Sequence, residues 1–354
     1  MILEYPKRIT LKDIARTANL SVAAVSMALR NHASLPASTI DRVKKIANEL
    51  GYRPDPALSA LAAHRTRMQT RRNVTVIACI SDWSTRDGWL ESPGARTLFD
   101  RASERAESLG YDLQHFWARE HGGFSPRLAK VLDARGIRSV ILAPAEDETQ
   151  PNEVDWSAFT VVSLEPPPLD ARVPHVGLNH FSNVVRCWHE LSERGISRVG
   201  FISRQTPAEF AQGQSLAAHT FNQSRSAHPF DRIPDLELTG EDEAEQIQAW
   251  LQEHKPQAII SSAPLHHVLT EELKLELSDS LSYISLDVTA EKADDVSGID
   301  ANMGIVGETV IDSLNQLQQR GITGQSASPV GTQVAGVWQN GTTLTSPPVL
   351  AKSG

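Results

Sequence analysis

Hydrophobic residues in the first fifty positions repeat at three- and four-residue spacing, in three short runs separated by polar residues. This spacing predicts three amphipathic helices. The first two are only about two turns long, below the roughly 12–15 residues that an isolated helix needs in water, so they must pack on one another or on the third. The apolar faces are formed by Leu11, Ile14, Ala15 and Ala18, then by Val22, Val25 and Leu29, and finally by Ile40, Val43, Ile46, Ala47 and Leu50.

The residues at the ends of these runs support the same three helices. Thr10 with Asp13 three residues later forms a capping-box-like start, and Ser21 is placed to cap the second helix after a turn at Asn19. Pro36 suits the first turn of the third helix, which Gly51 ends. The pattern is a helix-turn-helix, whose second helix can lie in a DNA major groove while the three helices share a small core.

A fourth short helix is predicted beyond Gly51, because Asp55 can cap a helix and Pro56 can occupy its first turn. Residues 65–72, RTRMQTRR, continue as a basic segment without helix breakers. A simple spacer is the alternative, but a spacer has no need of a capped Ala/Leu helix.

Charge divides the chain unevenly. The whole chain of 354 residues has a net charge of −9, yet residues 1–72 carry 13 Lys or Arg against five acids, a net charge of +8, which leaves −17 for residues 73–354. This asymmetry is expected when only one end of a protein contacts nucleic acid. A basic tail that merely aids solubility is the alternative, but this segment has a helical pattern rather than low complexity.

From residue 74 the pattern changes to apolar runs of strand length that alternate with amphipathic segments of helix length. Near-continuous Val/Ile/Leu runs between helices are typical of parallel sheets covered on both faces, in either one large sheet or two similar lobes. The strand-like runs are 74–80, 139–144, 160–164, 198–202, 257–261 and 283–287, and the helical stretches are 95–109, 181–194, 243–254 and 304–320.

Polar and aromatic residues that follow these strands are candidates for a ligand site, since ligands of open α/β sheets bind beyond the carboxyl ends of the strands. Carboxylates there can accept hydrogen bonds from sugar hydroxyls, and an indole can stack on a sugar ring. The alternative role for each acid or Ser is to cap the next helix. The candidates are Asp82, Trp83, Glu165, Arg204, Ser262 and Asp287.

Motifs for enzymatic chemistry are absent from the sequence. There is no phosphate loop, no G-x-G-x-x-G after a strand and no H-E-x-x-H, so we expect neither catalysis nor a cofactor or metal. Cys79 and Cys187 form no metal or disulfide motif. With no long apolar run and no signal-peptide pattern, we expect a cytoplasmic protein that does not bind membranes. A solute-binding protein or a binding-domain enzyme with an added basic end is the alternative class.

Residues 9–65 resemble the DNA-binding headpiece of the LacI/GalR family of bacterial transcription regulators. The segments TLKDIARTANLSVAAVSMALRN, ELGYRPDP and LSALA match the family pattern in order and spacing. The resemblance implies that Thr10 and Ser21 contact phosphates, that Leu11 lies near the groove, and that Val22, Ala23, Ser26 and Met27 face base edges. It also implies that Leu61 is the hinge leucine wedged into the central minor-groove step, which kinks the duplex.

Two headpiece positions depart from the family pattern. Met27 stands where the family usually has Arg, and Arg30 stands where it usually has Asn. Arg paired with guanine is the commonest direct base contact, and Met cannot make it. We therefore hypothesise that Val22, Ala23 and Met27 read thymine methyl groups, while Arg30 contacts the backbone or a flanking guanine.

The remainder of the chain resembles the periplasmic-binding-protein-like sensor domain of the same family, which favours two lobes. Its marks are weaker: GLNHFSN (177–183), RGISRVGFI (194–202), SGIDANMGIVGETVIDSL (297–314) and VAGVWQNGTTL (334–344), the last resembling a hairpin with Asn340-Gly341 as its tight turn. Asn179 replaces the family's Asp, and no Arg occurs between Arg204 and Arg225, where relatives usually place an effector-clamping Arg.

Together these patterns predict a small all-α headpiece (1–54), a hinge helix with a basic linker (55–73), and an α/β two-lobed domain with parallel sheets (74–354) that binds effector and forms a dimer. The resemblance implies a homodimeric transcription regulator, a repressor, that binds a palindromic double-stranded DNA operator under the control of a small, sugar-like effector. The sign of that control does not follow from the sequence.

Overall fold

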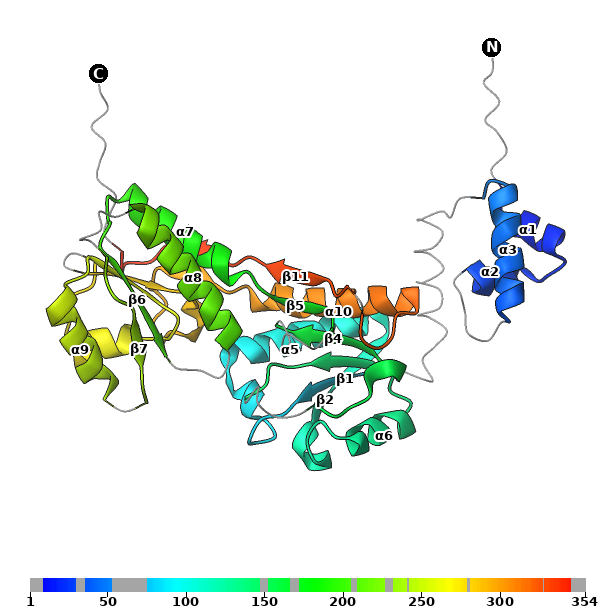
Figure 1. Ribbon diagram of the computed structural model, residues 1–354, viewed down its shortest axis with the longest axis horizontal. Coiled ribbons are helices and arrows are strands. Elements are labelled where there is room, and N and C mark those ends of the chain that lie inside the picture. Colours follow the sequence, from blue (N-terminus) through cyan, green and yellow to red (C-terminus); the bar gives the residue numbers. More distant parts are fainter. Residues whose placement is uncertain are drawn as a thin grey trace, which may run out of the picture.

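The computed structural model describes three bodies of secondary structure, one helical and two built on sheets (Figure 1). It describes residues 9–29, 36–52, 75–146, 152–165, 172–204, 209–226, 232–240, 242–278, 281–326 and 328–344.

The amino-terminal body consists of α1 (Leu11–Ala18), α2 (Val22–Leu29) and α3 (Ala37–Glu49). Ile14, Val25 and Val43, one from each helix, are completely buried and form its core. Asn19 adopts φ of 52°, which ends α1 and leaves only a short turn before α2. The three predicted helices are therefore confirmed, and their small core depends on all three.

Lobe 1 is built on a six-stranded sheet with the order β11-β5-β4-β3-β1-β2, in which every pair is parallel. Along β1, Ile77 and Cys79 face the core beneath α5 and α10, and Ala78 and Ile80 face the core beneath α6, as alternation along a strand requires. The elements are β1 (Thr75–Ser81), η1 (Gly88–Glu91), α5 (Pro93–Leu109), β2 (Tyr111–Trp117), η2 (Ala118–His121), α6 (Pro126–Ala134), β3 (Ser139–Leu142), η3 (Trp156–Ala158), β4 (Thr160–Leu164), β5 (His175–Leu178), α10 (Met303–Arg320) and β11 (Gly331–Val334).

Lobe 2 is built on a second six-stranded sheet with the order β12-β10-β9-β8-β6-β7, parallel except where β12 pairs antiparallel with β10. Helices α7 and α8 pack on one another over one face, and α9 contributes Ile247 and Trp250 to the other core. The elements are α7 (His180–Glu193), β6 (Val199–Arg204), α8 (Glu209–Ser226), β7 (Leu236–Leu238), α9 (Glu243–His254), β8 (Ala258–Ser261), η5 (Val268–Glu272), β9 (Ser282–Ser285), η6 (Val288–Ala290), β10 (Gly298–Asp300) and β12 (Val337–Gln339).

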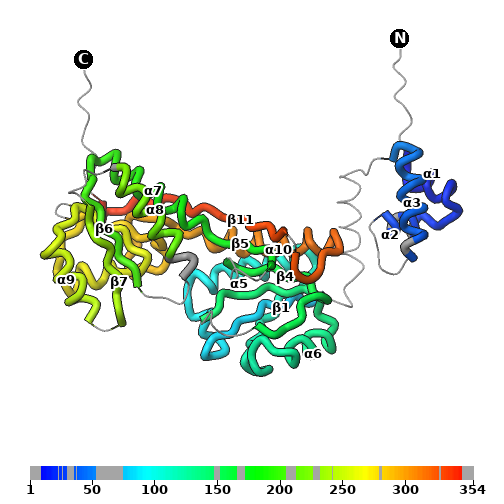
Figure 2. Tube along the Cα trace, in the orientation of Figure 1, coloured from blue at the N-terminus to red at the C-terminus, as the bar shows by residue number. Residues whose placement is uncertain are grey.

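The chain passes between the lobes three times: from β5 to α7, from β10 to α10, and from β11 to β12. The first and third passages are joined directly. Asn179 donates its backbone N–H to the carbonyl of Val334 at 2.8 Å, and Gly336 donates to Oδ1 of Asn183 at 2.9 Å. Figure 2 shows β5 and β11 side by side at this junction. The two-lobed arrangement expected from the sequence is therefore confirmed.

The prediction of a hairpin over residues 334–344 is wrong. Strand β11 ends at Val334 in the sheet of lobe 1, and β12 starts at Val337 in the sheet of lobe 2. Asn340-Gly341 joins no strand pair; Gly341 donates its N–H to Ser297 Oγ at 3.1 Å.

In lobe 2, His219 on α8 is completely buried and makes polar contacts with its neighbours. Trp188 Nε1 donates to His219 Nδ1 at 3.3 Å, which leaves Nε2 to carry the ring proton and face Asp235 Oδ1 at 3.3 Å. Burial lowers the pKa of His219 to about 4 and raises the pKa of Asp235 to about 6. The imidazole is therefore a neutral link between α7 and α8.

Helices α5 and α10 form the most extensive contact between helices of lobe 1 because Gly307 lets their backbones approach closely. A Cβ at Gly307 would lie 2.3 Å from the carbonyl oxygen of Leu98 and 3.1 Å from the backbone N of Ala102. Two exposed ion pairs cross the same contact, Arg101 to Glu308 at 2.8 Å and Arg105 to Asp312 at 2.6 Å. Exposed pairs contribute little to stability, so the glycine sets the spacing of the helices.

We expect Gly307→Ala to lower the free energy of unfolding by about 1–3 kcal/mol, because the added methyl group meets backbone atoms that cannot move aside. Gly304→Ala is the matched control in the same helix, since its Cβ would meet only the flexible side chain of Arg101 at 3.3 Å. Helix propensity makes the control neutral or more stable by up to about 1 kcal/mol. Urea denaturation followed by circular dichroism measures both; equal stability of the two variants would contradict this view of the contact.

Candidate functional site

The two capping hydroxyls predicted to contact phosphates lie on the headpiece surface. Thr10 is exposed, and its N–H and hydroxyl both donate to Asp13 Oδ2, at 3.0 and 2.7 Å. Ser21 is also exposed, and its Oγ accepts from the N–H of Ala24 at 3.1 Å. Both residues therefore fix the start of a helix and leave that end of the helix facing outward.

The second helix of the headpiece presents an apolar outer surface. Val22 is 41% exposed and Met27 is half-buried, whereas Val25 and Ala28 point into the core. Leu11 is half-buried and packs at the edge of the same core. Ala23 and Ser26 lie on α2, and Arg30 and Leu61 fall outside the described residues.

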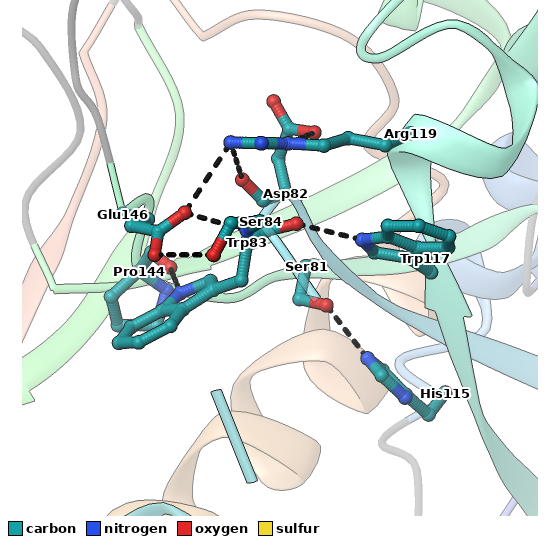
Figure 3. A network of polar contacts seen from close by, with 9 residues as sticks. All are labelled: Ser81, Asp82, Trp83, Ser84, His115, Trp117, Arg119, Pro144 and Glu146. Carbon is teal, nitrogen blue, oxygen red and sulfur yellow. Dashed lines mark hydrogen bonds and ion pairs between the residues drawn. The ribbon is translucent and has the colours of Figure 1, made fainter. Parts of the chain in front are cut away.

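A network of polar contacts joins the carboxyl ends of β1, β2 and β3 in lobe 1 (Figure 3). Asp82, which is 7% exposed, faces Arg119: Nε of Arg119 lies 3.3 Å from Asp82 Oδ1, and Nη2 lies 3.4 Å from Glu146 Oε2. Glu146 also accepts from the hydroxyl of Ser84 at 2.8 Å. One guanidinium thus bridges two carboxylates, and the cluster keeps one negative charge.

Two tryptophans complete this edge of lobe 1. Trp83 donates from its indole nitrogen to the carbonyl of Pro144 at 3.0 Å, and Trp117 donates to the carbonyl of Trp83 at 2.8 Å. Below them Ser81 Oγ lies 2.7 Å from His115 Nε2, and burial lowers the pKa of that imidazole. The indoles are held by their N–H groups, so their orientation is fixed.

Parallel pairing explains why these residues meet. Ser81 at the end of β1 is in register with Trp117 at the end of β2, so the residues that follow both strands leave the sheet at one edge. The sequence interpretation missed Trp117, Arg119 and Glu146. Strand β2, YDLQHFW, is an edge strand with polar residues and gave no continuous apolar signal, whereas Glu146, four residues after the apolar run of β3, could have been found by the rule that selected Asp82.

Glu165 follows β4 and lies at the first passage between the lobes. Its backbone has φ of 62°, and its Oε1 accepts from the N–H of Leu178 at 3.0 Å. Its Oε2 lies 3.5 Å from Nε2 of His180, the first residue of α7. Glu165 raises the pKa of the nearby His175, but burial outweighs this and lowers it overall.

Two of the three candidates of lobe 2, Arg204 and Asp287, have local side-chain partners. Arg204 makes a bidentate ion pair with Glu243, the first residue of α9, with Nε–Oε1 at 2.6 Å and Nη2–Oε2 at 2.8 Å. This pair raises the pKa of Arg204 and lowers that of Glu243. Asp287 caps η6 by accepting from the N–H and hydroxyl of Thr289, at 3.1 and 2.6 Å, while Ser262 is exposed.

The structure thus brings Asp82 and Trp83 into one network and leaves the other candidates in separate sets of contacts. The helix η6 that follows Asp287 packs against α5 of lobe 1, so this strand end of lobe 2 faces lobe 1. A cavity of 290 Å³ lies elsewhere, between α7 and α8, and no predicted site residue lines it. Its lining residues are Val185, Trp188, His189, Ser192, Asn222 and Arg225.

No helix within the described parts of the chain has the length and apolar character needed to cross a membrane.

Comparison with known proteins finds a family match for the headpiece and proteins similar to the longer part of the chain. Residues 10–55 match the family model of bacterial regulatory proteins, lacI family. The HTH-type transcriptional regulator TreR of Escherichia coli (strain K12) is 23% identical over 235 residues, which are 65% of this chain and 68% of TreR. Catabolite control protein A of Staphylococcus xylosus is 34% identical over 195 residues, 55% of each chain.

Among solved structures, the chain is similar to the lac repressor dimer bound to operator and the anti-inducer ONPF. The TM-score is 0.57 at 16% identity, and the match covers 96% of this chain and 100% of that one. At this identity the similarity establishes the fold. The named relatives are regulators, in line with the expectation of a regulator rather than an enzyme. The headpiece thus matches the lacI family model, and the rest of the chain has the fold of solved regulators of this kind.

Proposed function

We propose that the protein is a homodimeric transcription repressor that binds a palindromic DNA operator through its headpiece and a small sugar-like effector between its lobes. The observation that carries the proposal is the three-helix headpiece with an apolar, outward-facing α2, matched by the family model and followed by a two-lobed α/β domain. The solved relative bound to operator and anti-inducer supports the same combination of partners.

On DNA, α2 lies in the major groove, with Thr10 and Ser21 toward the phosphates, because both residues start helices whose amino-terminal ends favour anions. Leu11, Val22, Ala23, Ser26 and Met27 approach the bases, Arg30 contacts the backbone or a flanking guanine, and Leu61 inserts into the minor groove at the centre of the operator. A second protomer supplies the other half-site.

In lobe 1, Asp82 and Trp83 are the strongest effector candidates because they share one network with a bridging guanidinium and a second indole. Carboxylates that retain acceptor capacity bind hydroxyls, and fixed indoles stack on sugar rings. Glu165, which follows β4 of lobe 1, and Asp287, which follows β9 of lobe 2, are further candidates, although Asp287 is engaged by Thr289. Arg204 and Ser262 remain candidates, although Arg204 is engaged by Glu243.

We divide the chain for this function into a headpiece (1–54), a hinge helix and linker (55–73) and an effector-binding and dimerisation domain (74–354), and we place the protein in the cytoplasm, where its DNA target lies. The effector binds the two arrangements of the lobes with different affinities. The size of that difference limits how much the effector can change the affinity of the protein for its operator.

Deletion of residues 1–65 tests this division of labour. We expect the truncated protein to lose operator binding and to keep its effector. Genomic DNA fragments retained by the full chain at moderate salt, sequenced after elution, give the operator, and thermal shift against a panel of neutral mono- and disaccharides gives the effector. Recovery of bulk DNA without a palindrome would contradict specific binding, as would a truncated chain that binds the operator as tightly as the full chain.

Met27→Arg tests how the headpiece reads bases. We expect the variant to select operators with guanine at the contacted position, because Arg gains about 1–3 kcal/mol of discrimination from a bidentate contact with guanine. Asn48→Arg adds the same charge at an exposed position of α3 and should raise affinity without changing the selected sequence. Selection from random DNA gives the preferred operator of each variant. If Met27→Arg selects the same operator as the unmodified protein, the proposed base contacts of α2 are ruled out.

Asp82→Asn tests the effector site. We expect about tenfold weaker binding of the effector identified by the panel, because a hydrogen bond to a charged acceptor is worth roughly 1.5–3 kcal/mol. Operator binding without effector should persist. Asp133→Asn on α6, which removes an exposed carboxylate paired with Arg138, is the control. Calorimetric titration measures both proteins, and equal affinities would remove Asp82 from the site.

A further inference from the structure

Two polar atoms at the first passage between the lobes are buried without a hydrogen-bond partner. Oε2 of Glu165 and Nε2 of His180 are both shielded from solvent, and each lacks a hydrogen bond within the described structure. They lie 3.5 Å from one another. A charged N–H···O⁻ hydrogen bond is shorter, about 2.7–2.9 Å, so the two atoms are close to bonding distance without reaching it.

The carboxylate is held firmly by lobe 1. Glu165 donates its backbone N–H to the carbonyl of Val176 at 2.9 Å, and its Oε1 accepts from the N–H of Leu178 at 3.0 Å. Its side chain lies over Gly177, where a Cβ would come within 2.6 Å of Oε2. The left-handed backbone of Glu165 and the missing side chain at Gly177 together fix the carboxylate against β5.

The imidazole belongs to lobe 2. His180 is the first residue of α7, and the preceding Asn179 caps that helix by accepting from the N–H of Ser182 at 2.9 Å. Helix α7 packs on α8 and on the sheet of lobe 2. Any rotation of lobe 2 about this passage therefore changes the distance between Glu165 Oε2 and His180 Nε2.

We propose that Glu165 and His180 form a proton-dependent latch between the lobes. When the imidazole carries both ring protons, Nε2–H donates to Oε2 and draws α7 toward the end of β4. When the ring is neutral, the attraction is weaker and the pair stays open. Because the lobe arrangement is what the effector is proposed to control, the regulatory meaning of the latch rests on the proposed function.

Other titratable groups lie near α7. His175 on β5 faces the same carboxylate, Glu165. Asp300 on β10 accepts from the N–H of Asn302 at 2.8 Å, and on α8 the guanidinium of Arg225 lies over the ring of Phe221. His219 is buried in lobe 2, where it is bonded to Trp188 and faces Asp235.

The experiment measures the distance between the lobes as pH changes, by single-molecule fluorescence transfer in the full-length protein. Lys130→Cys on α6 and Gln252→Cys on α9 place dyes on exposed positions of lobes 1 and 2. Cys79 and Cys187 are 2% and 0% exposed, and burial raises the pKa of both thiols, so they do not compete for dye. Dilution into unlabelled protein leaves one labelled protomer per dimer.

We expect the transfer efficiency to shift between pH 8.0 and pH 5.5, where imidazoles gain their charge, and this shift to disappear in His180→Gln and in Glu165→Gln. His189→Gln, an exposed histidine of the same helix, should keep the shift. Circular dichroism verifies that each variant is folded.

Three results would overturn the latch: no shift in the wild-type protein, a shift that persists in either Glu165→Gln or His180→Gln, or a shift that His189→Gln also abolishes. Titration of Asp235 falls in the same pH range and would produce a shift that survives both latch variants. The measurement uses neither DNA nor effector, so its failure is distinct from a failure of operator binding.

Discussion

The three passages of the chain between the lobes are the constraint on which the rest of the structure depends. A backbone hydrogen bond from Asn179 to Val334, and one from the Gly336 N–H to the side chain of Asn183, bind the first passage to the third. This pairing brings the carboxyl ends of β4 and β5 to the start of α7. The distance between side chains on the two sides of this junction therefore depends on how the lobes are arranged.

The charged candidates for the ligand site differ in whether their charge is already neutralised by a neighbouring side chain. Arg204 and Glu243 neutralise one another in a bidentate pair, and Asp287 is occupied by Thr289, so both are explained by local structure. At the edge of lobe 1 the balance differs, because Arg119 is shared by Asp82 and Glu146. Such a surplus of acceptors suits a neutral donor-rich molecule and disfavours an anion.

Much of the fold could be predicted from sequence because its strands are buried on both faces. The runs that became β1, β3, β4, β6, β8 and β9 were evident, and so were the headpiece helices with their caps. Strands β2, β7, β11 and β12 were missed because they lie at sheet edges and are short or polar, and the interior strands β5 and β10 were missed because they have only four and three residues. Of the candidate site, Asp82 and Trp83 follow an evident strand, whereas Arg119 follows a missed one. The contact between Glu165 and His180 depends on the backbone conformation of Glu165, which no spacing rule predicts.

The positions of the edge strands in the sequence determine which parts of the molecule can fold first during synthesis. Each sheet takes an edge strand from residues 331–339, and lobe 1 also needs α10 to cover its core. Neither lobe can therefore complete itself until residues 331–339 have left the ribosome, whereas the described headpiece core lies within residues 11–52. The segment proposed to bind DNA can thus fold first, well before the segments that would regulate it.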